Sequence, residues 1–206
     1  MTEEQASSAA DPGPGAPVRA PRRLRIDAQR NIDALLKAAK AVFVSSGVDA
    51  PAKEIADQAG VGVGTLYRHF PQRSDLVKAV LEHEIDACAE GAARLAATNP
   101  PGEALATWLH SYTDLLATKP RLAPALHSGD PAFDELPRYF WQRFEPALAS
   151  LLHAAAASGE IRGDISPKEL LYAVASLCLP MENEGVAYSQ RMVALLINGL
   201  RYSADD

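Results

Sequence analysis

Cysteine is scarce in this chain of 206 residues, which contains two, Cys88 and Cys178. Each stands among apolar residues, a setting that favours buried and reduced thiols over a disulfide framework. A redox pair formed by the two remains an open alternative. This cysteine usage is typical of a cytoplasmic protein, and we expect that location.

Long apolar runs are also missing, although 48% of the residues are hydrophobic. Charged residues interrupt every candidate run before it reaches the roughly 20 residues that a membrane-spanning helix needs. Residues 1–21 begin with acidic residues and have no apolar core, so we expect neither a secretory signal nor a membrane anchor there. The same segment is rich in Ala, Pro, Gly and Ser, which predicts a disordered tail.

A positive net charge, common in nucleic-acid-binding proteins, is absent from the chain as a whole, whose formal net charge is −6. The charges are unevenly distributed, however. Residues 20–76 hold nine Lys/Arg and six Asp/Glu, a net charge of +3, whereas residues 77–206 hold ten and seventeen, a net charge of −7. A basic N-terminal third on an acidic body indicates a nucleic-acid-binding module joined to a second part with a different role.

Strand-like alternation of apolar and polar residues beside turn signals is not found either, so the predicted fold class is all-α. Apolar residues recur instead at helical spacing. The longer helices are expected at about 27–46, 73–97, 102–117, 137–158, 167–179 and 188–202. Prolines are expected to cut residues 118–137 into short pieces, and Pro146 is expected to kink or split the helix around it.

The most informative stretch of the sequence is residues 54–70. Its pattern predicts two helices joined by a glycine turn. The first ends at Gly60, because glycine adopts a left-handed backbone conformation without a Cβ clash. The second runs from about Val63 to His69, with Leu66 and Phe70 on its inner face. A tight turn containing glycine between two short helices is the signature of a helix-turn-helix.

These residues closely resemble the DNA-binding domain of the tetracycline-repressor-type (TetR) family of bacterial transcription regulators. The motif comprises Glu54-Ile55-Ala56, Ala59-Gly60-Val61, Gly64-Thr65-Leu66-Tyr67-Arg68-His69-Phe70-Pro71 and Asp75-Leu76. The strong resemblance covers residues 28–78, and weaker similarity extends to residues 157–165 and 191–196.

The resemblance implies a nine-helix architecture, with three helices for DNA binding and six for effector binding and dimerisation. On this basis we expect a disordered tail over residues 1–21 and a helix-turn-helix DNA-binding domain over residues 22–76. A ligand-binding and dimerisation domain would occupy residues 77–206. No enzymatic activity, cofactor or metal is expected.

The resemblance also predicts which residues contact DNA. They are Arg22, Arg23, Arg25, Lys53, Val63, Gly64, Thr65, Tyr67, Arg68, His69 and Arg73. A helix-turn-helix inserts its second helix into the major groove, so Val63, Gly64 and Thr65 would face bases. Val63 and Gly64 offer few polar groups, so Thr65, Arg68, Lys53 and the shape of the DNA would carry much of the specificity.

The other predicted contacts go to the DNA backbone, which sets position rather than sequence. Tyr67 and His69 would hold phosphates. Arg73, at the start of the next helix, would do so with help from that helix's N-terminus. The arginines at residues 22–25 are expected to form a flexible arm that lies along the backbone or enters a minor groove.

Aromatic residues concentrate between residues 108 and 144, which suggests a pocket for a mainly apolar or aromatic small-molecule effector. The candidate pocket residues are Trp108, His110, Tyr112, His127, Phe133, Tyr139, Phe140 and Phe144. Any one of these aromatics can instead be ordinary core.

The last two helices carry wide apolar faces, which the family packs against their copies to form a homodimer. A two-fold dimer presents its recognition helices about 34–36 Å apart, to match successive major grooves of a palindromic operator. The resemblance implies a repressor that an effector releases from DNA by tilting the long helix near residues 73–97.

Other classes of function explain less of the sequence. Gly60, Gly62 and Gly64 lack the preceding strand and the third glycine of a dinucleotide-binding loop. A helical protein-interaction module without DNA binding fits the acidic body but leaves the basic third unexplained.

Metal binding is a further alternative. The candidates are His110 with Asp114, and Glu82 with Asp86 beside His83. Neither set has a clear third ligand in the sequence, and a solvated helix face explains both.

Overall fold

The computed structural model describes residues 20–126, 128–179 and 185–201, and for residues 20–28 and 118–126 it describes the backbone alone. The described residues form an all-α fold without strands, which confirms the predicted class. Its elements are α1 (Ala20–Ser46), α2 (Ala52–Ala59), α3 (Val63–His69), α4 (Arg73–Thr98), α5 (Pro101–Leu126), η1 (Pro131–Phe133), α6 (Leu136–Ala157), α7 (Pro167–Leu177) and α8 (Val186–Leu200).

Within this described part the helices number eight, with one short 3-10 helix, rather than the nine expected. The difference lies in residues 118–137, which were expected to break into pieces. Helix α5 instead continues through Pro120 and Pro124 to Leu126. A proline removes one backbone hydrogen bond and crowds one carbonyl, and the rest of the helical ladder tolerates this loss. Pro146 likewise does not split α6, in which it occupies an exposed position.

The start of α1 also differs from expectation. The helix begins at Ala20 rather than near residue 27, so the backbone of Arg22, Arg23 and Arg25 is helical and does not form a flexible arm. The predicted disordered tail falls almost entirely on residues outside the described part. Its last two residues, Ala20 and Pro21, belong to α1.

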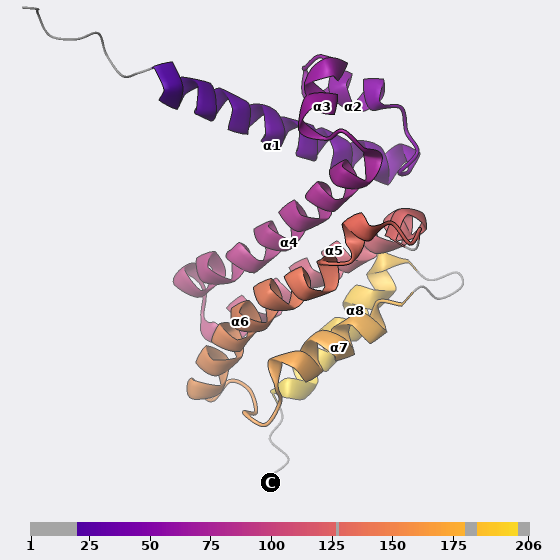
Figure 1. The fold of residues 1–206 in the computed structure, drawn as a ribbon. Coiled ribbons are helices and arrows are strands. Elements are labelled where there is room, and N and C mark those ends of the chain that lie inside the picture. The colour runs from indigo at the N-terminus through magenta and orange to yellow at the C-terminus, as the bar shows by residue number, and fades with distance from the viewer. Residues whose placement is uncertain (1–19, 127, 180–184, 202–206) are drawn as a thin grey trace, which may run out of the picture.

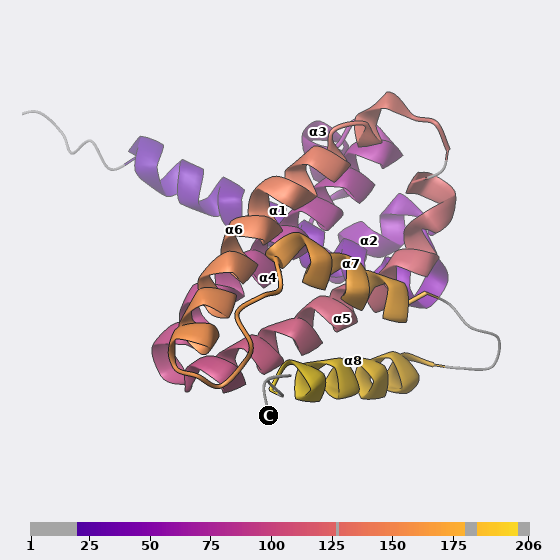
Figure 2. The same cartoon turned by 90° about the horizontal axis from the view of Figure 1, so that it is seen from below.

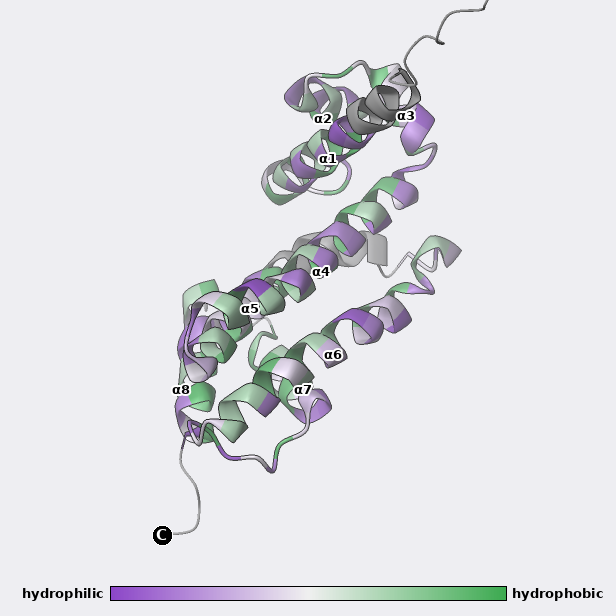
Figure 3. Cartoon of the chain, turned by 90° about the vertical axis from the view of Figure 1, so that its left-hand side faces the viewer, coloured by the Kyte–Doolittle hydropathy of each residue, from purple (hydrophilic) through white to green (hydrophobic). Residues whose placement is uncertain are grey.

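Helices α1, α2 and α3 gather at one end of the molecule, and α4 runs from them along the remaining helices (Figure 1). The side view in Figure 3 shows the same division, with α4 as the connection between the two parts. Helix α4 packs against α1 at one end and against α5 and α6 along its length. One continuous helix therefore belongs to both parts.

Two hydrophobic cores reflect this division. The first joins α1, α2, α3 and the start of α4, and includes Leu35, Phe43, Ile55, Leu66 and Val77. The second joins the rest of α4 to α5, α6, α7 and α8, around Trp108 and Phe144. Phe133 of η1 and Leu136 of α6 are distant in sequence from α1–α3, and yet both belong to the first core.

Helices α7 and α8 pack against each other at the end of the body remote from α2 and α3 (Figures 1 and 3). Figure 2 shows the body from this end. Helix α7 begins with a capping box, in which the Ser166 hydroxyl accepts a hydrogen bond from Glu169 N and the Glu169 carboxylate accepts one from Ser166 N. None of the described helices has the length and hydropathy needed to cross a membrane.

Candidate nucleic-acid interface and ligand cavity

The turn between α2 and α3 has the geometry that the sequence predicts. Gly60 adopts φ 70° and ψ 28°, the left-handed conformation that ends α2. Its N–H donates to carbonyls of the last turn, and Val61 N donates to Ala56 O at 3.0 Å. The chain therefore reverses within a few residues, and α3 begins at Val63.

Helix α3 has one buried and one open face. Leu66 is 2% exposed and Phe70 9%, and both belong to the first core. Tyr67 on the opposite face is 52% exposed, and Arg68 is exposed beside it. A large aromatic side chain and a cation thus stand in solvent on a helix whose other side is firmly anchored.

The positions expected to face bases are small and accessible. Gly64 is exposed, while Val63 and Thr65 are half-buried. A Cβ atom added at Gly62 or Gly64 would meet no other atom within 4 Å. These glycines are therefore not required by packing within the chain, and the open space in front of them is available to a ligand.

Lys53 and Arg73, both predicted to contact DNA, have partners within the protein. Lys53 Nζ lies 2.6 Å from Asp57 Oδ2 on the exposed face of α2, and this carboxylate raises the pKa of the lysine. The Arg73 guanidinium donates to Ala50 O and lies over the Phe43 ring, 5.4 Å from its centroid. Arg73 consequently fastens the start of α4 to the first core.

His69 is half-buried at the end of α3, and its ring lies 6.3 Å from that of Phe70, centroid to centroid. The side chains of Arg22, Arg23 and Arg25 lie outside the described atoms. Of the predicted DNA-contacting residues, the structure therefore gathers Lys53 and those of α3 around one turn, and gives Arg73 a structural role.

A cavity of about 410 Å³ lies between α4, α5, α6 and α7. Its lining residues are Leu81, Ile85, Tyr112, Leu115, Leu116, Phe133, Leu136, Pro137, Phe140, Trp141, Leu171, Tyr172 and Ala175. All of these are aliphatic, aromatic or proline residues, and none carries a formal charge.

The polar groups on this wall come from Tyr112, Trp141 and Tyr172. The Tyr112 hydroxyl points to Leu171 O at 3.5 Å, and burial, followed by two nearby thiols, raises its pKa. The phenol is therefore neutral at physiological pH. A wall of this chemistry suits a neutral ligand with much apolar surface.

The predicted pocket residues separate into groups in the structure. Tyr112, Phe133 and Phe140 line the cavity. Trp108 and Phe144 are fully buried in the second core and are not part of the wall. Trp108 is fixed there because its indole N–H donates to Cys88 O at 2.8 Å.

The remaining predicted pocket residues lie elsewhere. His110 and Tyr139 are half-buried outside the cavity wall, and His127 lies outside the described residues. The sequence reasoning missed the aliphatic wall from α4, α5 and α7. The helical spacing of those residues marks them as inward-facing, but it does not separate residues that fill a core from residues that border a void.

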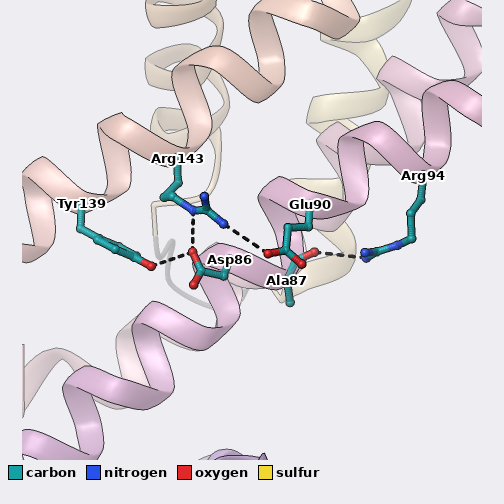
Figure 4. Close-up of polar contacts among 6 residues, drawn as sticks. All are labelled: Asp86, Ala87, Glu90, Arg94, Tyr139 and Arg143. Carbon is teal, nitrogen blue, oxygen red and sulfur yellow. Dashed lines mark hydrogen bonds and ion pairs between the residues drawn. The ribbon is translucent and has the colours of Figure 1, made fainter.

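A polar cluster ties α4 to α6 beside the cavity (Figure 4). Asp86 Oδ1 accepts hydrogen bonds from Tyr139 Oη at 2.7 Å and from Arg143 Nε at 2.6 Å. Arg143 Nη2 also lies 3.3 Å from Glu90 Oε1. Burial, and then the hydrogen bond to Asp86, raises the pKa of Tyr139 to about 12, so its hydroxyl stays a donor.

The two cysteines are free thiols, and both are half-buried. Burial, with a smaller effect of Glu84, raises the pKa of Cys88 to about 12. Burial also raises the pKa of Cys178. Both thiols are therefore poor nucleophiles near neutral pH.

The metal-site candidates have other partners. Asp114 accepts a hydrogen bond from Gln190 Nε2 at 2.7 Å, and Asp86 is occupied by Tyr139 and Arg143. Across the part of the chain that the structure describes, no group of three or more His, Cys, Asp or Glu is arranged to hold a metal ion.

Comparison with known proteins places these features in a family. Residues 35–80 match the family described as bacterial regulatory proteins, tetR family, and residues 100–202 match the C-terminal domain of SbtR-like transcriptional regulators. An HTH-type transcriptional regulator of Staphylococcus aureus (strain USA300) is 38% identical over 64 residues, 31% of this chain. That match spans 35% of the relative's own length.

Two solved structures are similar over most of their length. The TetR transcriptional regulator SCO0520 from Streptomyces coelicolor is 36% identical, with a TM-score of 0.73 over 84% of this chain and 99% of its own. The TetR transcription regulatory protein from Mycobacterium vanbaalenii is 32% identical, with a TM-score of 0.67 over 87% and 99%. These proteins are transcriptional regulators rather than enzymes, and the chain belongs to their family, the TetR family of DNA-binding transcriptional regulators.

Proposed function

We propose that this chain acts in the cytoplasm as a homodimeric repressor, which binds a palindromic operator through α3 and releases it when a small effector fills the cavity. The observation that carries the proposal is the course of α4. This helix begins at Arg73, which is fastened to the first core, and farther along contributes Leu81 and Ile85 to the cavity wall. One rigid element thus connects the surface proposed to bind DNA with the site proposed to bind the effector.

On the DNA side, the exposed Tyr67 and the neighbouring His69 would contact phosphates. The exposed Arg68 would contact a phosphate as well as share in the base readout expected from the sequence. Val63, Gly64 and Thr65 would face the bases. Because the first two offer no polar side chain, readout of DNA shape would add to the direct contacts. Lys53 would exchange Asp57 for a phosphate or a base. We retain residues 22–76 as the proposed DNA-binding domain.

Dimerisation is proposed for α7 and α8. Both helices carry exposed apolar side chains, with Tyr172 55% and Leu195 63% exposed. A Cβ atom added at Gly199, one turn beyond Leu195, would meet no atom within 4 Å. This open apolar face is suited to close approach by a second copy, and a two-fold dimer would pair two α3 helices with two half-sites.

The effector class follows from the cavity wall. A neutral molecule with aromatic or aliphatic groups fits the uncharged wall, while a carboxylate or phosphate would lose its hydration without gaining a counter-ion. A coupling free energy of about 1–3 kcal/mol between the two sites would change operator affinity about 5- to 150-fold.

Selection of bound duplexes from a random pool tests this proposal. We expect enrichment of an inverted repeat whose half-sites lie about one helical turn apart. Light scattering should give a dimer, which Leu195→Glu should dissociate. Recovery of no enriched sequence, or of one without two-fold symmetry bound by a monomer, would overturn the proposal.

A further inference from the structure

The cavity lies where the two hydrophobic cores meet. Leu81 packs against the first core, and Ile85, one turn later on α4, is a member of the second. Both line the cavity. A molecule in this space would therefore touch the core that holds α3 in place as well as the core of the body.

Phe133 and Leu136 connect the cavity directly to the first core. Each is 8% exposed, and each belongs to both the first core and the cavity wall. They come from η1 and the first residue of α6, in the middle of the body's sequence. Their side chains nevertheless complete the core formed by α1, α2, α3 and the start of α4.

The segment that carries Phe133 is held in shape by its own hydrogen bonds. Asp130 Oδ1 accepts from Ala132 N at 2.9 Å, and Ser128 Oγ accepts from Asp130 N at 3.2 Å. Helix η1 also contacts α4 directly. Such a capped turn moves as a unit, so displacement of the Phe133 ring would be passed to the helices packed on it.

We propose that Phe133 and Leu136 are the positioning residues that transmit cavity occupancy to the DNA-binding helices. This inference rests on the proposed function and adds a specific route to it. An occupant that displaces these two side chains repacks the first core against the start of α4, and the direction of α3 changes with it. If cavity occupancy were instead transmitted through α4 alone, Phe133 and Leu136 would be dispensable for coupling.

The test uses N-phenyl-1-naphthylamine, a neutral apolar fluorescent probe, and an operator duplex taken from the selection experiment. Probe fluorescence reports binding to the cavity, and anisotropy of the labelled duplex reports operator affinity. The ratio of operator affinities without and with saturating probe is the coupling factor, expected at about 5- to 150-fold in the full-length protein.

Phe133→Leu and Leu136→Ala each remove part of the cavity wall and should weaken probe binding, so both are compared with wild type at saturating probe, where the coupling factor should fall to within about threefold of one. Leu116→Ala is the matched control, because Leu116 lines the same cavity but is not part of the first core. It should change probe affinity and leave the coupling factor in the wild-type range.

Filling the cavity by substitution tests the same route without a ligand. Ala175→Phe adds a ring from the α7 side of the cavity and should weaken operator binding about 5-fold or more. Adding Phe133→Leu should restore affinity to within about twofold of wild type.

The outcomes separate the two claims. If no duplex is enriched, or if neither the probe nor Ala175→Phe alters operator affinity, the proposed function is wrong. Transmission through Phe133 and Leu136 is then wrong as well. If coupling is present in wild type and persists unchanged in Phe133→Leu and Leu136→Ala, the route through the shared side chains is wrong and the proposed function stands.

Discussion

Arg143 of α6 and Asp86 of α4 form the most direct polar link between the two helices, with 2.6 Å between Nε and Oδ1. Asp86 directly follows Ile85 of the cavity wall. The pair is about one-third exposed on each side, so solvent screens it, and its contribution is expected at about 0.2–1 kcal/mol. The position of this ion pair is what matters, because it joins α4 to α6 beside the cavity.

A double-mutant cycle with Asp86→Asn and Arg143→Gln should measure that contribution. Unfolding by urea is expected to give a coupling energy of about 0.2–1 kcal/mol, which shrinks in 1 M salt. The exposed pair Arg138 and Glu135 is the control, because it joins neighbouring residues and links no two helices. A coupling energy of zero for the first pair would show that it does not hold α4 to α6.

Stability should fall at alkaline pH, in part through Cys88. Its pKa is about 12 in the folded chain against 9.0 as the ordinary value, so the folded state retains the proton where the unfolded state has lost it. The contribution of the thiol to the free energy of unfolding is complete below pH 9 and is lost as pH rises towards 12. Over this range the free energy of unfolding falls by up to about 1.4 kcal/mol per pH unit.

Urea unfolding between pH 8 and pH 11 measures this dependence. The slope of unfolding free energy against pH should be shallower in Cys88→Ser than in wild type, whatever the absolute stability of the variant. Equal slopes would mean that the Cys88 thiol ionises as readily in the folded chain as in the unfolded one.

Gly60→Ala should destabilise the chain by about 1 kcal/mol, because the left-handed conformation at this position disfavours a Cβ atom. Gly62→Ala is the matched control, since Gly62 has φ −71° and open space around it. The difference in thermal midpoint between the two variants measures the effect. Equal midpoints would show that the turn does not depend on the glycine at residue 60.

Gly64→Ala separates stability from DNA binding. An added Cβ meets no atom in the free protein, and alanine favours the helix by up to about 1 kcal/mol over glycine. The variant should therefore be at least as stable as wild type, yet bind operator less tightly if the backbone of α3 approaches the bases. Unchanged operator affinity would remove Gly64 from the proposed contact surface.

Much of the fold was predictable because helix ends depend on local chemistry. The stop at Gly60 appears as expected, and α7 begins at Pro167, where the helix was expected to start. Helix α5 was harder to predict, since Pro120 and Pro124 signal a break that the chain does not make. Local propensity alone does not determine where a helix ends.

The candidate sites show the same limit. The residues of α3 could be assigned roles because a motif fixes their geometry. The cavity could not be outlined in the same way, because Trp108 and Tyr112 lie one turn apart on the same helix and are both buried in the second core, and yet only Tyr112 also borders the void. That distinction arises from how α5 and α6 meet, which depends on residues far apart in the sequence.

The dependence of operator affinity on salt, compared between wild type and Arg68→Ala, tests the central claim most directly. Arg68 is exposed on α3, and Arg94, an exposed arginine of the body near the far end of α4, provides the control Arg94→Ala. If α3 contacts DNA phosphates, Arg68→Ala should weaken binding and reduce the slope of log affinity against log salt by about one per protomer. Arg94→Ala should change neither quantity. Wild-type affinity and slope in Arg68→Ala, or an equal loss in both variants, would contradict the assignment of α3 as the DNA-binding surface.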